Sequence, residues 1–548
     1  MSGAASRSGP TRRRFSLGRL VFDNPVYALT LKGRRPKELA ASPEDPWPGD
    51  PKIADALFQG RYRFAGEEVH RHNLPPWDGE ERSDAWMAEL HGFAWLRHFT
   101  ASGGEAAKRQ ARALVASWLS LYAQWDALAW RPDVLGQRLI AWFANADLLL
   151  DGADATFRAG VLRSMARQSR HLARSARSAG DGAPRLIAVS GLIHAGICLP
   201  GGGRLARGLR LLEQELAQQI LADGGHVARS PAMQMKILRD LVQLRGALLS
   251  SSNDVPTSLQ NAIDRMAPLL RFFRHGDGRL ALFHGSSENA EAEIDLTLTR
   301  ADAKGKPPAS APYTGFERAA AKRALLIVDV GAPPMAETGV MPHAAPLALE
   351  FSVGRERILV NCGSPANPAS AMARALRQTA AHATAVLADT DAVEMRRGGA
   401  SAASAVGVSC ERNEADGSVW LDARHDGYWR EFGLAHRRRL FLDASGDDLR
   451  GEDTFSGTGR RPVPFHIRFH LHPDVDASLV QNGASVLLKL ASGAGYRFRA
   501  SGGAVRLEES IYFGSGAMRR TEQIVISGTT APQGETRVKW ALGKAPAS

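Results

Sequence analysis

The chain has 548 residues, of which 44% are hydrophobic and 23% charged, a balance that is typical of a folded protein and excludes wholesale disorder. A chain of this length exceeds what one hydrophobic core usually organises, so we expect two domains. The formal net charge of +12 indicates a surface that attracts polyanions such as nucleic acid, anionic lipid or acidic polysaccharide. Charge alone does not choose among them, and a GC-rich genome also produces chains rich in arginine and alanine.

The N-terminal residues 1–40 form the first expected segment, a basic arm that contains Arg12, Arg13 and Arg14. The arm lacks the apolar stretch of a signal peptide, and no run in the chain approaches the roughly 18 apolar residues of a membrane span. By these criteria we expect a soluble protein, cytoplasmic on sequence alone. The arm could bind nucleic acid, but no known DNA-binding or RNA-binding motif accompanies it, so nucleic acid is the least favoured partner.

Residues 41–300 are expected to be helical. Apolar residues recur there at helical spacing, as at Ala111, Leu114, Val115 and Trp118, and Gly, Pro and Asp separate the segments. Successive amphipathic helices without strands between them are typical of helical hairpins packed in a ring. The clearest predicted helices are 137–150, 155–176, 185–198, 203–222 and 231–248.

Residues 301–312, ADAKGKPPASAP, have the composition of a linker. After it, in residues 313–548, the pattern changes to short runs rich in β-branched and aromatic residues, bounded by Gly, Asp or Pro. Closely spaced strands without helices between them indicate an antiparallel β-sandwich, so the fold class is α+β with several domains. The clearest predicted strands are 324–330, 347–353, 357–360, 465–470 and 485–490.

Aromatic residues concentrate in the helical part, where eight of the eleven tryptophans precede residue 150. Flat rings can stack on sugar rings, and arginines lie between them in the sequence. Trp95, Trp130 and Trp142, with Arg138, are therefore candidate substrate-binding residues. For any single tryptophan, packing in the core is the alternative interpretation.

The segment from Asp223 to Pro231, DGGHVARSP, lies between two predicted helices. Its Gly-Gly pair gives a sharp turn, and Ser230 and Pro231 begin the next helix. His226 and Arg229 at this position could bind a uronate carboxylate, because loops on a rigid scaffold often carry sites. The alternative is a structural turn with a solvated histidine.

Histidines are frequent in the second half of the chain. His343 and His382, with Asn361, lie near the ends of predicted strands and could hold zinc, although three residues so far apart in sequence are a weak signal. Alternation along 465–470 places His466, His470 and His472 on one face of a strand. A face of hydrogen-bonded histidines is the favoured interpretation there, rather than a metal cage.

In these segments the chain resembles the heparinase II/III family of bacterial polysaccharide lyases, and the resemblance covers nearly the whole sequence. The resemblance rests on several motifs that occur in the same order as in the family, although each motif is only moderately specific. The matching segments are 54–66, 90–96, 130–142, 223–226, 347–363, 379–384 and 425–428.

The resemblance implies an incomplete α/α toroid followed by an antiparallel β-sandwich. It also implies β-elimination on an acidic, uronic-acid-containing polysaccharide, in which a Tyr or His removes the C5 proton after the carboxylate is neutralised. No organic cofactor is implied, while His343, Asn361 and His382 would hold zinc. Lyases of this family generally act in the bacterial periplasm or cell envelope, which conflicts with the lack of a recognisable signal peptide.

The departures from the family pattern fall at the proton-transfer positions. Met233 stands where the family has its catalytic Tyr, and Met341 where it has a catalytic His. At the position that neutralises the carboxylate only Arg185 could substitute, and Asn361 replaces an Asp ligand. The remaining candidate catalytic residues are His226, Arg229, Arg185 and Tyr428.

Three hypotheses follow from these matches and departures. The first is a divergent lyase acting on acidic polysaccharide. The second is a glycan-binding or envelope-related member of the family that does not cleave. The third is a basic nucleic-acid-binding protein.

Overall fold

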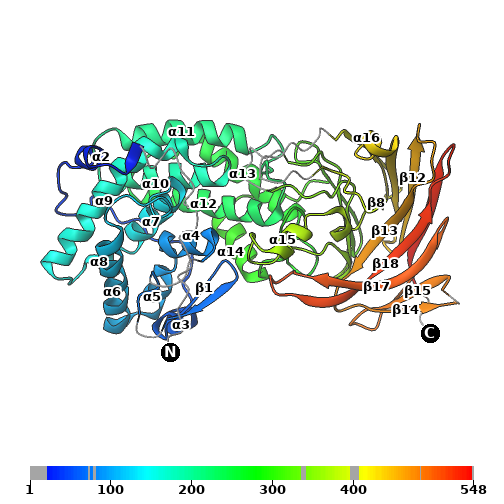
Figure 1. The fold of residues 1–548 in the computed structure, drawn as a ribbon, viewed down its shortest axis with the longest axis horizontal. Coiled ribbons are helices and arrows are strands. Elements are labelled where there is room, and N and C mark those ends of the chain that lie inside the picture. Colours follow the sequence, from blue (N-terminus) through cyan, green and yellow to red (C-terminus); the bar gives the residue numbers. More distant parts are fainter. Residues whose placement is uncertain are drawn as a thin grey trace, which may run out of the picture. The chain divides into compact units, whose positions relative to one another are not determined.

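The computed structural model describes residues 21–71, 74–77, 82–334, 341–394, 406–481 and 483–545, and within these the chain divides into two compact units. Unit 1 consists of the described residues up to Tyr62, with Val69–Ala179 and Ile187–Gly208. Unit 2 consists of Arg63–Glu68, Gly180–Leu186 and the described residues from Leu209 onward. Along the chain, helices come first and strands follow (Figure 1).

Unit 1 is built almost entirely from helices, with the hairpin β1 (Arg61–Phe64) and β2 (Glu67–His70) shared with unit 2. Arg12, Arg13 and Arg14 of the predicted arm lie outside the described residues. The helices are α2 (Pro25–Thr30), α3 (Pro51–Phe58), α4 (Asp84–Gly92), α5 (Leu96–Ser102), α6 (Gly104–Tyr122), α7 (Pro132–Ala144), α8 (Ala146–Leu150), α9 (Ala155–Ser175) and most of α10 (Ala183–Cys198).

Helix boundaries follow local chemistry. Asp154 begins α9 because its carboxylate accepts hydrogen bonds from the backbone N–H groups of Thr156 and Phe157. The predicted helix 137–150 is interrupted at Asn145, whose side chain donates to the Ala141 carbonyl and accepts from the Thr100 hydroxyl. These bonds compete with the helical backbone pattern, so α7 ends and α8 begins there.

Unit 2 begins with helices and continues into the sheets. Its helices include the second half of α11 (Arg204–Gln219), α12 (Pro231–Ser250), α13 (Thr257–Phe272) and α14 (Glu291–Ala301). The segment predicted as a linker, 301–312, connects α14 to β3 (Ser310–Ala311) inside this unit. Helices α12, α13 and α14 therefore share a compact unit with the strands.

The strands of unit 2 form two large antiparallel sheets among the described residues, as predicted for a sandwich. The first contains β3, β4 (Phe316–Ala321), β5 (Ala324–Asp329), β6 (Leu349–Val353), β7 (Glu356–Val360), β8 (Ala385–Leu387), β13 (Pro464–Leu471), β17 (Ala504–Tyr512) and β18 (Arg519–Thr529). The second has the order β14 (Asp476–Val480), β15 (Ser485–Lys489), β16 (Gly495–Ser501), β19 (Thr536–Lys544), β12 (Asp448–Gly457), β11 (Leu434–Leu442), β10 (Ser418–His425), β9 (Val408–Ala415).

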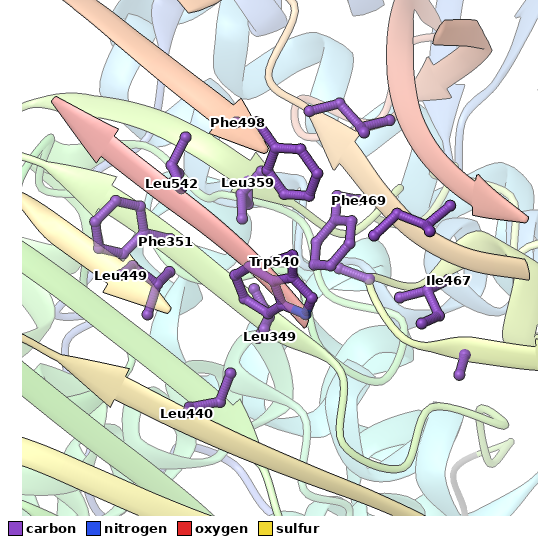
Figure 2. Close-up of a cluster of buried hydrophobic side chains, with 14 of the residues drawn as sticks. Leu349, Phe351, Leu359, Leu440, Leu449, Ile467, Phe469, Phe498, Trp540 and Leu542 are labelled. Carbon is purple, nitrogen blue, oxygen red and sulfur yellow. The ribbon is translucent and has the colours of Figure 1, made fainter. Parts of the chain in front are cut away.

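The core of unit 2 lies between these sheets. Along β10 and β11 buried and exposed residues alternate, which is the pattern of a strand with one face inside. Leu440 and Trp540 from one sheet meet Phe351 and Phe469 from the other (Figure 2). In the part of the chain that the structure describes, no helix has the length and apolar character needed to cross a bilayer.

Candidate functional site

The turn after α11 is held against the first strands of the sandwich. The Asp223 carboxylate accepts the backbone N–H groups of Gly225 and Thr314 and the Thr314 hydroxyl, at 2.7–3.1 Å. A Cβ on Gly225 would lie 1.8 Å from that hydroxyl oxygen, and one on Gly224 would lie 2.1 Å from the Arg265 carbonyl oxygen. The two glycines are therefore required by close approach, and the motif fixes the turn to the loop before β4.

His226 lies inside this turn with only 1% of its surface exposed. Its Nε2 donates to the Gln219 side chain over 3.1 Å, and its Nδ1 accepts from the backbone N–H of Ala228. Both ring nitrogens are thus bonded, and burial lowers the pKa of His226 to about 4. His226 is therefore a neutral residue that stabilises the turn through hydrogen bonds. This corrects both the prediction of a catalytic role and the alternative of a solvated histidine.

Arg229 has a positive φ of 55° and a buried side chain. Its guanidinium donates to the carbonyl oxygens of Thr314 at 2.6 Å, Gly315 at 3.0 Å and Ala332 at 2.6 Å, and forms an ion pair with Asp329. With its donors directed to these acceptors, Arg229 joins the turn to the end of β5. This arrangement does not present a free cation to a substrate carboxylate.

Asp329 and His284 complete the network. Burial alone would raise the pKa of Asp329, but the charge of Arg229 and the hydrogen bond from His284 hold it below its ordinary value. His284 donates from Nε2 to the Asp329 carboxylate over 2.8 Å, and its Nδ1 has no hydrogen-bond partner among the described residues. An oriented histidine with an unbonded ring nitrogen is the arrangement of a general base, yet His284 is only 2% exposed.

The predicted metal ligands are only partly brought together. His343 Nδ1 lies 3.3 Å from His382 Nε2, so the two rings bond to each other. Asn361 accepts from the backbone N–H of Ala383 with its oxygen and donates to Glu350 with its nitrogen. Among the described residues no group of three or more His, Cys, Asp or Glu side chains could hold a metal ion. The donor set therefore does not fit the family's zinc.

Arg185 and Tyr428 also occupy structural positions. The Arg185 guanidinium bonds to Asp181, in the turn before α10, and lies 3.9 Å from Glu215. Tyr428 is 1% exposed and its hydroxyl donates to the Ala385 carbonyl over 2.7 Å. Burial raises the pKa of Tyr428 well above its ordinary value, so this phenol does not ionise readily. Arg185 is connected to His226 indirectly, because Glu215 also accepts a hydrogen bond from Gln219, and the Gln219 side chain bonds to His226.

The predicted substrate-binding residues pack the core of unit 1. Trp95, Trp130 and Trp142 are at most 3% exposed, and Arg138 is fully buried. Arg138 donates to the Gln168 side chain and to the carbonyls of His91 and Ala129 at 2.7–2.8 Å, and burial lowers its pKa to about 9. These four residues are corrected from a sugar-binding to a packing role, the alternative that the sequence left open for the tryptophans.

The remaining residues of interest are the two methionines at family catalytic positions and the histidines of one strand. Met233 lies half-buried in the first turn of α12, and Met341 is 49% exposed. His466 and His470 on β13 bond to the hydroxyls of Ser527 and Ser510 at 2.9 and 2.8 Å. The interpretation of hydrogen-bonded histidines is confirmed for these two.

The fold and the turn define the class of helical and β-sandwich proteins to which polysaccharide lyases belong. A family profile described as "Heparinase II/III-like, C-terminal" matches residues 303–541. "FtsZ-localized protein C" of Caulobacter vibrioides is 34% identical over 543 residues, which cover 96% of this chain and 93% of that protein.

Solved structures agree with this class. A mutant heparan sulfate lyase of Pedobacter heparinus is 15% identical, with a TM-score of 0.66 over 95% of this chain and 87% of that one. A heparinase III structure is 13% identical, with a TM-score of 0.70 over 88% and 81%. The chain belongs to the heparinase II/III-like family, and the predicted toroid and β-sandwich class is confirmed.

Sequence reasoning missed Asp329, His284 and Glu350. Asp329 is a lone carboxylate at the end of the apolar strand β5, and Glu350 is one within β6. A charged residue inside such a run must find a buried partner, so this signal was available. His284 precedes a glycine in a short loop and gave no distinctive signal.

Proposed function

We propose that this chain is a non-cleaving member of its family, which uses the lyase fold to bind acidic polysaccharide and localises with FtsZ at the cell envelope. One observation carries the first part. His226, Arg229 and Tyr428, which were candidates for the catalytic roles, form hydrogen bonds inside the protein, and Arg229 alone donates to four backbone carbonyls and the Asp329 carboxylate. Methionine, which cannot transfer a proton, stands at positions 233 and 341.

The state of the titratable groups supports the same conclusion. β-Elimination needs a base that reaches the sugar C5 proton and a group that neutralises the carboxylate. His226 is bonded at both ring nitrogens, and Tyr428 is bonded to a backbone carbonyl and resists ionisation. Neither side chain is exposed to a substrate in this structure.

The place of action is inferred from a relative. The Caulobacter protein bears the name "FtsZ-localized", and the match extends over 96% of the present chain. We infer the same localisation here. A fluorescent fusion that co-localises with labelled FtsZ would support this, and a diffuse signal with intact FtsZ structures would contradict it.

A divergent lyase is the second candidate, and His284 is the observation that favours it. Asp329 orients its ring and leaves Nδ1 as an unbonded acceptor. A hollow of about 580 Å³ begins at the adjacent Gly285 and is also lined by Glu288, Asn289 and Ser364. If a substrate entered there and displaced the covering residues, His284 could accept a proton.

Ultraviolet absorbance of unsaturated uronate separates the two candidates. The protein is incubated with heparan sulfate, alginate, hyaluronan and glucuronan, with and without zinc. The proposal expects a flat trace, together with retention on a glycan affinity gel without change in chain length. A rise in absorbance contradicts non-cleavage, and loss of that rise in His284→Ala would assign the base.

A further inference from the structure

The outer face of the second sheet carries an ordered row of side chains. Strand registers place Trp420 opposite Phe441 and Phe441 opposite Arg450. Arg450 is opposite Ala541, which in turn is opposite Arg499. Cross-strand partners point to the same face of a sheet, so these five side chains cross β10, β11, β12, β19 and β16 in one line. All five strands have a paired neighbour on both sides.

A hollow lies along this row. Gly451, Ala500 and Ala541 line a hollow of about 920 Å³, with the aromatic pair on one side and Arg499 on the other. Gly451 has no room for a side chain, because a Cβ there would lie 2.1 Å from the ring of Trp540, a core residue labelled in Figure 2. Gly451 and Ala500 are both opposite Trp540 in the strand register and face the core, so the floor of the hollow is formed by backbone and by the Ala541 methyl group.

The aromatic pair exposes apolar area that the fold does not use. Trp420 is 41% exposed, and its ring centroid lies 4.8 Å from that of Phe441 at an interplanar angle of 43°. Two neighbouring rings on an open sheet form a platform for the apolar face of a sugar ring. Core packing, which accounts for the buried tryptophans of unit 1, does not account for Trp420.

The row is cationic. Arg450 lies 5.8 Å from the Phe441 ring and pairs with Asp448 on its own strand, outside the hollow. Arg499 has no carboxylate partner among the described residues. The adjacent row contains the acids Glu411, Asp422 and Glu452, of which Glu452 pairs with Arg439 and Asp422 pairs with Arg437. In the row with the two rings, the cation without a described carboxylate partner is Arg499.

We propose that this hollow binds an acidic oligosaccharide, with sugar rings stacked on Trp420 and Phe441 and a carboxylate or sulfate bonded to Arg450 and Arg499. An acidic peptide fits less well. Extended peptides gain affinity from main-chain pairing at a free sheet edge, and the hollow lies in the sheet interior, where that pairing is already complete. The site rests on the proposed function and names where the glycan binds, and the sandwich core separates it from β5 and the Arg229 network.

The test compares two double variants in the full-length protein. Trp420→Ala with Arg499→Ala removes one ring and the unpaired cation. Trp429→Ala with Arg430→Ala is the matched control, since Trp429 is 44% exposed and both residues lie on α16 (Trp429–Phe432), outside the hollow. Both variants change charge equally, and unfolding curves confirm that each is folded.

Calorimetric titration with short oligosaccharides of heparan sulfate, alginate and hyaluronan gives the affinities. We expect at least one of these to bind the first variant about tenfold more weakly than wild type, with the control unchanged and Trp420→Phe recovering part of the loss. Equal affinities of wild type and the first variant for all three overturn the proposal. So does tighter binding of polyglutamate at the same residues. Product length is checked after each titration, so cleavage would contradict the proposed function without affecting this result.

Discussion

Arg229 forms a buried ion pair with Asp329, although 100 residues separate them in the sequence. The pair joins the turn before α12 to the end of β5, and His284 bonds to the same carboxylate. A charge transferred from water into a protein interior is stabilised only by such partners. The helical and β segments of unit 2 are therefore linked by a network in which each charged member depends on the others.

Removal of one member should destabilise unit 2 strongly. We expect Arg229→Met or Asp329→Asn to lower the free energy of unfolding by about 3–5 kcal/mol, because the remaining partner is left buried without compensation. Urea unfolding followed by circular dichroism measures this change. Arg537→Ala is the control, since its pair with Glu535 is exposed and its removal should leave the free energy of unfolding nearly unchanged. A loss at Arg229 as small as that of the control would contradict a structural role.

Because several histidines are buried, we predict that the protein loses stability in mild acid. The pKa of His226 is lowered from 6.5 to about 4 by burial, so between these values the unfolded chain binds a proton that the folded chain does not. The stability contribution is thus complete above pH 6.5 and decreases as the pH falls toward 4. His194 and His470 shift in the same direction for the same reason.

The variant His226→Gln tests the contribution of one of these histidines to the pH dependence of stability. Glutamine can still donate to Gln219, but it does not titrate. The slope of unfolding free energy against pH in this window should fall by about 1.4 kcal/mol per pH unit. Urea unfolding at a series of pH values gives the slope. An unchanged slope would mean that His226 is protonated in the folded state.

The elements of the fold could be predicted from sequence because periodicity is a local property. The predicted strands 324–330 and 357–360 correspond to β5 and β7. The break at Asn145 was missed because it depends on a bond to Thr100, a residue far away in the sequence. For the same reason, no local pattern indicated that α12–α14 share a compact unit with the sheets.

The candidate site was predictable only in part. The DGGH motif correctly drew attention to His226 and Arg229, but not to their burial, because a residue's partners are not visible in its own segment. Asp329 contacts Arg229 but is far from it in the sequence. Trp142 is buried because neighbouring helices pack on it. Residue type indicates which chemistry is possible, while tertiary contacts decide whether it is exposed.

Arg138 provides a test of the corrected substrate-binding prediction. Arg138→Leu removes three donors and leaves Gln168 and two carbonyls without them, so we expect a loss of about 1–3 kcal/mol for each buried acceptor that stays unpaired in unit 1. Glycan affinity per folded molecule should remain that of wild type. Calorimetry on protein whose folded fraction is known from circular dichroism tests both points. A folded variant with selectively weaker glycan binding would restore the sugar-binding hypothesis.

Metal removal tests the family's zinc site. His343 and His382 bond to each other, and both polar atoms of the Asn361 side chain have protein partners, so we expect no stoichiometric zinc in purified protein and no change in Tm after dialysis against EDTA. Elemental analysis and scanning calorimetry measure these quantities. Asn361→Asp replaces a donor to Glu350 with a second carboxylate and should cost about 1–3 kcal/mol, whereas the exposed Asn413→Asp should cost nearly nothing. Bound zinc in wild type, with a lower Tm after EDTA, would show that the rings separate around a metal and would refute this assignment.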